Sequence, residues 1–100
     1  MERTVIFTVS DFKKWMGSCY STFAIDTETT SLNYLELEII GFSICDGDRA
    51  CYVDLTWCDD SAHVLRLLRF YINDADVIIM HNAPFDMMVL KKYNIEIRRE

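Results

Sequence analysis

The chain has 100 residues, of which 51% are hydrophobic and 26% charged, a composition that predicts one globular domain with an apolar core and argues against disorder. The chain has ten Lys and Arg residues and sixteen Asp and Glu residues. The resulting net charge of −6 argues against a protein that binds nucleic acid through a broad basic surface. Divalent ions at an acidic site would reverse the local sign of the field, so a contact mediated by metal ions stays open.

The four cysteines show neither C-x-x-C pairs nor the ligand spacing of a zinc site. No N-terminal segment resembles a signal peptide, and the longest apolar runs are far too short to span a membrane. We therefore expect reduced thiols in a cytoplasmic protein with no membrane partner. Cys45 and Cys51 flank a predicted hairpin and could approach each other, but the expected compartment argues against a native disulfide.

The first third of the chain predicts a strand, a short helix and a second strand. Residues 4–9 (TVIFTV) are rich in β-branched residues, which favour a strand. Ser10 is the expected N-cap of a helix that ends at Gly17, because apolar residues recur at i, i+3 and i+4 from Phe12. The next strand is residues 22–27 (TFAIDT).

Residues 36–45 and 49–55 predict an antiparallel hairpin, because two β-rich runs flank an Asp-Gly turn. Residues 60–73 predict an amphipathic helix capped by Ser61 or Asp60. Its expected apolar face consists of Val64, Leu65, Leu68, Tyr71 and Ile72.

Residues 76–80 (DVIIM) form a continuous apolar run, which is typical of a strand buried on both faces. Residues 81–93 open with Asn and Pro and continue into helix formers, so they predict a final helix. The order is strand, helix, three strands, helix, strand, helix. It predicts a single α/β domain over residues 1–100, with a mixed sheet and flanking helices.

Asp26 and Glu28 pose the main chemical question of the sequence, because they lie two residues apart at the end of a predicted strand. Side chains of a strand alternate between its faces, so both carboxylates share one face with Cα atoms roughly 6–7 Å apart. If residues 22–27 and 76–80 are parallel neighbours, Asp86 converges with them at one edge of the sheet. Three carboxylates in one place predict a site for hard divalent cations, whose ligands are oxygens.

Structural interpretations of the same residues stay open at this point. Asp86 in the first turn of a helix, and Asn82 near its N-cap, would stabilise that helix without any catalytic role. Asp26 and Glu28 could equally form the solvated end of a strand.

Two segments carry a family resemblance. FAIDTETTSL (residues 23–32) resembles the first motif of the DEDD 3′-5′ exonucleases, specifically of the proofreading domain of DNA polymerase I-type enzymes. HNAPFDMMVLKKY (residues 81–93) resembles their second motif, N-x-x-x-D, placed after a strand and at the start of a helix. About sixty residues separate the motifs, with a hairpin and a helix between them, as in that family. The resemblance spans essentially the whole chain and implies a ribonuclease-H-like fold.

The resemblance implies two-metal hydrolysis of a 3′-terminal nucleotide. Asp26 would bridge two divalent ions, Mg²⁺ or Mn²⁺. Glu28 would bind the ion that activates the attacking water, and Asp86 would help to hold the second. The expected substrate is the 3′ end of a single strand, with DNA favoured over RNA.

The resemblance also implies substrate contacts. Leu32 would wedge against the terminal bases, Asn82 would organise the site or contact the substrate, and Phe85 would lie along the single strand. Thr27 is expected to join these substrate-binding residues.

The sequence departs from the family pattern after Asp86. A fourth carboxylate, in a Y-x-x-x-D or H-x-x-x-D motif on a later helix, is not found in residues 87–100, and a strand and a helix of the fold are also absent. The sequence therefore leaves three alternatives. The chain is a C-terminally incomplete exonuclease domain, whose parent protein can include a polymerase domain. Otherwise it is an inactive nucleic-acid-binding module, or a subunit completed by another chain. An exposed sheet edge would favour a homodimer.

Overall fold

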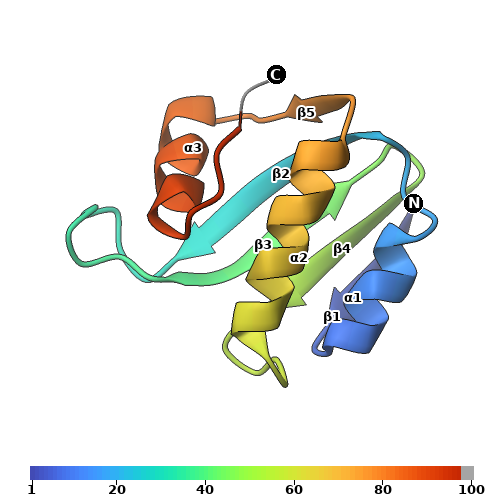
Figure 1. Cartoon of the computed structure of the whole chain (residues 1–100), viewed down its shortest axis with the longest axis horizontal. Helices are drawn as coiled ribbons and strands as arrows, with labels where there is room; N and C mark the ends of the chain where they lie inside the picture. Colours follow the sequence, from blue (N-terminus) through green and yellow to red (C-terminus); the bar gives the residue numbers. More distant parts are fainter. Residues whose placement is uncertain (98–100) are drawn as a thin grey trace.

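The computed structural model describes residues 1–97 and shows a five-stranded sheet with flanking helices (Figure 1). In chain order the elements are β1 (Glu2–Ile6), α1 (Val9–Met16), β2 (Thr22–Thr29), β3 (Ile39–Cys45), β4 (Arg49–Asp54), α2 (Ser61–Asp74), β5 (Val77–Ile79) and α3 (Ala83–Lys92). This order is the predicted one, and the α/β class is confirmed. Within residues 1–97, no helix combines the length and the apolar character needed to cross a membrane.

The strand order along the sheet is β1-β4-β3-β2-β5, and β3 runs antiparallel to both of its neighbours while the other pairs are parallel. The predicted hairpin is β3–β4, and its turn contains Gly47 at a φ of 96°, where residues with a Cβ are strained. β2 and β5 are parallel neighbours, as expected, but Thr22–Ala24 of β2 are its only residues that pair with β5. One edge of β2 therefore has no strand partner beyond Ala24 in the described part of the chain.

One face of the sheet, the inner face, is covered by α1 and α2 (Figure 1). Phe12 of α1 packs edge-on against Phe42 of β3 and Tyr71 of α2, with ring centroids 5.6 Å apart in each pair. The strands contribute alternate residues to this core, including Phe23, Ile25, Ile44, Cys51 and Val53. The predicted apolar faces of both helices are thereby confirmed.

The opposite face of the sheet, the outer face, is left open by α1 and α2. Val77 is 38% exposed and Ile79 is 53% exposed, although residues 76–80 were expected to be buried on both faces. That prediction is wrong, because β5 is a three-residue edge strand of which only Ile78 faces the core. An apolar run of this length does not by itself distinguish a central strand from an edge strand.

The first helix begins earlier than expected. Thr8, not Ser10, is the N-cap of α1: its backbone is extended and its Oγ1 accepts a hydrogen bond of 3.0 Å from the backbone N–H of Asp11. The preceding strand accordingly ends at Ile6, short of the predicted residues 4–9.

The hairpin register separates two of the cysteines. Cys45 is opposite Ala50 and Cys51 is opposite Ile44, so the two thiols project to different faces of the sheet and cannot form a disulfide within the hairpin. All four cysteines are free thiols. Burial raises the pKa of the Cys51 thiol to about 12, which keeps it in its unreactive neutral form.

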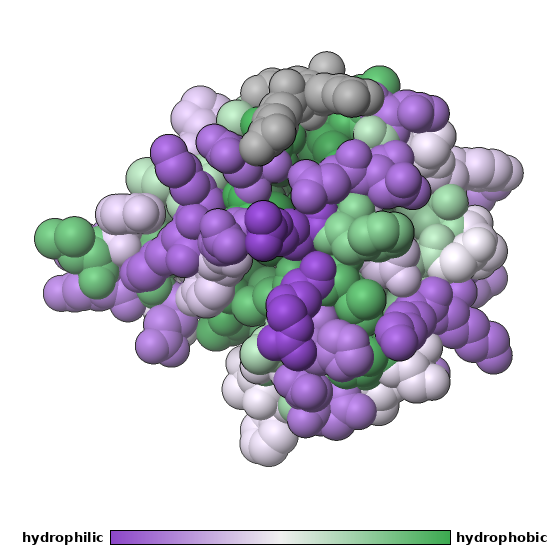
Figure 2. Space-filling view, viewed as in Figure 1, coloured by the Kyte–Doolittle hydropathy of each residue, from purple (hydrophilic) through white to green (hydrophobic). Residues whose placement is uncertain are grey.

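Residues 30–38 form a loop that projects beyond the sheet from the end of β2 (Figure 1). Its base is closed by a 2.9 Å hydrogen bond from the N–H of Thr30 to the carbonyl of Glu38. At its tip Leu32 is 83% exposed and Leu35 is 86% exposed. Figure 2 shows this apolar tip at the left extreme of the molecule. The loop therefore holds two leucines in solvent on a closed base.

Lys92, the last residue of α3, ties this loop to the domain. Its Nζ donates to the carbonyl oxygens of Tyr34, at 3.1 Å, and Leu37, at 2.7 Å. The same ammonium group lies over the Tyr34 ring, 5.5 Å from its centroid, and the side chain of Leu37 is fully buried. The position of the loop thus depends on α3 as well as on β2.

Replacing this lysine should loosen the loop. We expect Lys92→Met to lower the free energy of unfolding by about 0.5–1.5 kcal/mol, because the two carbonyls lose a donor. Amide hydrogen exchange in residues 30–38 should become faster. The matched control is Lys91→Met on the exposed neighbour, with an expected change within about 0.5 kcal/mol. Equal effects of the two substitutions, measured by urea unfolding, would contradict the proposed tie.

Candidate functional site

Asp26 and Glu28 lie near the end of β2 and point to the outer face, as their spacing predicts. Both are exposed, whereas Thr27 between them is buried. Across the strand pair, Asp26 is opposite Ser43 and Glu28 is opposite Gly41 on β3. Two carboxylates are therefore available to a ligand that approaches the outer face.

Asp86 occupies a different position, in the first turn of α3, and is only 1% exposed. Its Oδ1 accepts two hydrogen bonds from Thr27, one of 2.6 Å from the hydroxyl and one of 3.3 Å from the backbone N–H. That N–H lies on the edge of β2 that β5 leaves unpaired, because the β2–β5 ladder stops at Ala24. The carboxylate of Asp86 thus takes the place of a missing strand partner.

Thr27 was expected to contact the substrate, but it is buried in this structure. Its side chain is 7% exposed and faces Asp86 on the side of β2 away from Asp26 and Glu28. We assign Thr27 to positioning Asp86. The alternation of side chains along D-T-E contains this signal, because a residue between two outward carboxylates must face inward.

The three carboxylates do not gather into one cluster. Within residues 1–97, no three His, Cys, Asp or Glu side chains lie close enough to hold a metal ion together. The reason is geometric: Asp26 and Glu28 project from the outer face, while Thr27 holds Asp86 at the strand edge. The three carboxylates, which were expected to converge at one edge of the sheet, thus do not form a three-ligand cluster, and the individual ligand roles stay predictions.

One oxygen of Asp86 nevertheless lacks any partner. Its Oδ2 is buried and has no hydrogen bond, although its Oδ1 accepts two. Buried carboxylate oxygens are normally paired, and an unpaired one is costly. A cation or a hydrogen-bond donor brought by a ligand would satisfy this oxygen, so the residue fits the role of an oxygen ligand.

The remaining predicted site residues lie around this strand end. Asn82 is the exposed N-cap residue of α3, and its side chain makes no capping hydrogen bond, so the purely structural interpretation of this residue is not supported. Phe85 is half-buried and packs against the core. Leu32 is exposed in the loop that follows β2.

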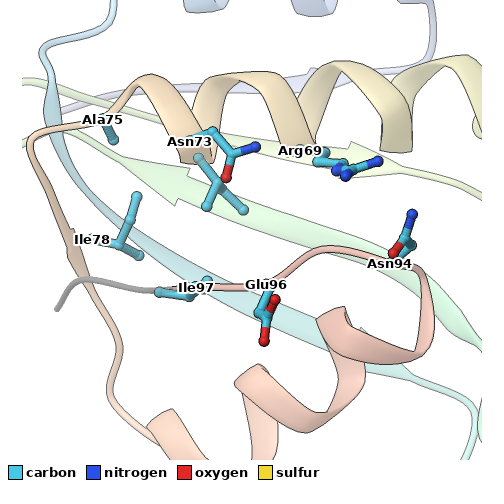
Figure 3. Close-up of a pocket in the computed structure, with 8 residues that line it drawn as sticks. Arg69, Asn73, Ala75, Ile78, Asn94, Glu96 and Ile97 are labelled. Atoms are coloured by element: carbon cyan, nitrogen blue, oxygen red, sulfur yellow. The ribbon is translucent and has the colours of Figure 1, made fainter.

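A cavity of about 250 Å³ lies elsewhere, between the end of α2 and the segment after α3 (Figure 3). Polar side chains reach it from Arg69, Asn73, Asn94 and Glu96. None of the predicted site residues lines it, so the cavity is separate from the carboxylate site.

The Thr27–Asp86 pair can be tested directly. We expect Thr27→Val to lower the free energy of unfolding by about 1–3 kcal/mol, because the buried carboxylate loses its shortest hydrogen bond. Thr27→Ser keeps the hydroxyl, so its free energy of unfolding should fall by less than half the decrease expected for Thr27→Val. Thr22→Val replaces an exposed residue of the same strand, and its free energy of unfolding should stay within about 0.5 kcal/mol of that of the unchanged chain. Equal urea-unfolding curves for Thr27→Val and Thr22→Val would show that the hydroxyl does not hold Asp86.

Comparison with known proteins places this arrangement in a family. Residues 4–99 match the 3′-5′ exonuclease family of the DNA polymerase A type. DNA polymerase I of Rhizobium leguminosarum is 28% identical over 113 aligned positions, which cover 85% of this chain and 11% of the relative. DNA polymerase I of Chloroflexus aurantiacus is 35% identical over 81 positions, covering 75% and 9%. The chain thus spans about a tenth of the length of these relatives.

Solved structures agree on the fold. The EXO domain of Aedes aegypti Nibbler superposes with a TM-score of 0.76 at 14% identity, covering 94% of this chain and 47% of that one. Escherichia coli RNase D gives 0.69 at 18% identity, covering 92% and 24%. The expected ribonuclease-H-like fold is thereby confirmed. The chain belongs to the 3′-5′ exonuclease domain family of DNA polymerase I-type proteins.

Proposed function

We propose that this chain supplies the first two motifs of a metal-dependent 3′-5′ exonuclease that removes nucleotides from the 3′ end of single-stranded DNA. The observation that carries the proposal is the arrangement around β2: two exposed carboxylates on its outer face, and a third carboxylate, fixed at its edge, with one unpaired oxygen. DNA is favoured because both sequence relatives are DNA polymerases I.

Asp26, Glu28 and Asp86 are the residues that would hold two divalent ions, Mg²⁺ or Mn²⁺. The exposure of Asp26 and Glu28 and the free Oδ2 of Asp86 support this assignment. A structural neighbour, Brucella melitensis NrnC, has been solved with bound Mg²⁺; its TM-score is 0.58 at 20% identity, over 99% of this chain and 45% of that one. When bound, such ions supply hydroxide at neutral pH and stabilise the leaving oxygen.

The other residues would bind and orient the strand. Leu32 is exposed on a loop with a closed base, so its side chain is available to contact the terminal bases. Asn82 makes no side-chain capping hydrogen bond at the start of α3, and Phe85, three residues later, is only partly buried. The acidic chain, with a net charge of −6, would repel a polyphosphate in the absence of cations.

Metal binding is the first test. We expect Mn²⁺ to bind the 100-residue chain, as measured by electron paramagnetic resonance of the free ion, and Asp26→Ala to remove the strongest part of that binding. The matched control is Asp74→Ala, at the exposed end of α2, which should leave the binding curve unchanged. An identical response of the chain and its Asp26→Ala variant would mean that the metal site is misplaced.

The same variant tests the chemistry. Two-metal hydrolysis requires ions fixed well enough to align the water, and a misplacement of about 1 Å can reduce the rate roughly a hundredfold. Residues 1–100 contain no Y-x-x-x-D or H-x-x-x-D segment after Asp86, so with Mg²⁺ they should degrade a 3′-labelled single strand no faster than Asp26→Ala. A chain extended through such a segment should gain an activity that Asp26→Ala removes. Activity of the 100 residues that Asp26→Ala abolishes would contradict the argument from the missing motif and would mean that a second chain, Glu96 or Glu100 supplies the fourth ligand.

We further propose that the open edges of the sheet support self-association. Within the described residues 1–97, β1 and β5 are the edge strands, and β5 exposes Val77 and Ile79 beside an edge with no strand partner. Unpaired strand edges tend to pair with other chains. We expect a dimer or larger species in multi-angle light scattering at high concentration. A monomer at every concentration would contradict this expectation.

A further inference from the structure

Gly41 occupies a central position on the outer face. It lies on β3 directly between Glu28 on β2 and Asp54 on β4. A Cβ atom built on Gly41 would overlap the phenol of Tyr52, including its hydroxyl oxygen, and would lie 2.8 Å from the Cε1 atom. A glycine inside a strand often marks such a close approach. The missing side chain of Gly41 therefore makes the space into which the Tyr52 phenol fits.

The phenol of Tyr52 reaches this space from the neighbouring strand. Tyr52 lies on β4 opposite Ser43, in the same cross-strand row as Asp26, and its ring extends over Gly41. Residues directly opposite on one face have Cβ atoms about 4.5–5.5 Å apart. A hydroxyl in the place of the Gly41 side chain is thus within side-chain reach of Glu28.

The electrostatics agree with this placement. Burial, followed by the Asp54 and Glu28 carboxylates, raises the pKa of Tyr52 above its ordinary value. The hydroxyl therefore keeps its proton at neutral pH and remains a hydrogen-bond donor next to two anions. It cannot act as a base there.

Of the two carboxylates, Asp54 already accepts hydrogen bonds, whereas Glu28 accepts none from residues 1–97. Oδ1 of Asp54 already accepts the backbone N–H groups of Thr56, at 3.0 Å, and Trp57, at 3.1 Å, which turns Asp54 toward its own loop. Within residues 1–97, neither the Tyr52 hydroxyl nor the Glu28 carboxylate makes a hydrogen bond. A free donor on β4 and a free, exposed acceptor on β2 therefore share the outer face, with Gly41 of β3 between their strands.

We infer that Tyr52 is a positioning residue, whose hydroxyl donates a hydrogen bond to the Glu28 carboxylate and fixes its orientation when it binds a divalent ion. The inference rests on the proposed function, since it assigns Glu28 a ligand role. Carboxylate ligands of metals are commonly oriented by such outer partners, whose removal typically weakens metal binding about 10–100-fold.

The test is Mn²⁺ binding by Tyr52→Phe. Phenylalanine keeps the ring over Gly41 and removes only the hydroxyl, so the unfolding midpoint in urea should stay unchanged. We expect the Mn²⁺ dissociation constant to rise about tenfold, the lower end of the range for outer partners. A purely structural role of the ring would leave Mn²⁺ affinity unchanged, and that result would overturn the inference.

Two further variants separate the possible failures. Tyr20→Phe removes the hydroxyl of another, exposed tyrosine, which donates a hydrogen bond of 2.9 Å to Asp48. This variant should not change Mn²⁺ affinity. A tenfold loss in Tyr20→Phe as well would attribute the effect to the loss of any tyrosine hydroxyl and overturn the role of Tyr52. If Asp26→Ala weakens binding and Tyr52→Phe does not, the inference alone fails. If neither weakens it, the metal site itself is wrong.

Discussion

The buried hydrogen bonds between Thr27 and Asp86 are the contact on which the rest of the site depends. They join α3 to β2 at the edge that β5 leaves unpaired, and they fix a carboxylate that would otherwise be buried without a partner. Because only Oδ1 is used, the other oxygen keeps its full capacity as an acceptor. A single threonine thus anchors α3 to β2 and leaves one buried carboxylate oxygen of Asp86 without a partner.

β2 serves the core and the site at the same time. Its inward residues, such as Phe23 and Ile25, pack under α1 and α2, and its outward residues at the same end are Asp26 and Glu28. The rigid core on one face therefore sets the backbone from which the carboxylates project. The packed inner face of β2 thus supports two exposed like charges, two residues apart, on its outer face.

On the outer face, the absence of a side chain at Gly41 of β3 determines where the Tyr52 ring lies. Gly41 leaves a gap between the two strands that carry Glu28 and Asp54, and the phenol of Tyr52 fills it. The loop after β2 is fixed from the other side, because Lys92 of α3 holds its backbone. The loop that carries Leu32 is thus positioned by an element distant in sequence, whereas the Tyr52 ring is positioned within the β3–β4 hairpin.

The sequence by itself determined the order of the elements, the β3–β4 hairpin, the shared face of Asp26 and Glu28, and the family. These features depend on local rules: hydrophobic periodicity, turn residues and the two-residue repeat of a strand. Tertiary structure alone decided the position of Asp86 relative to the pair, the contact that Thr27 makes with Asp86, and the exposure of Val77 and Ile79. Each of these depends on which strand lies at an edge and where a ladder stops, and neither property is encoded in the residues of the strand itself.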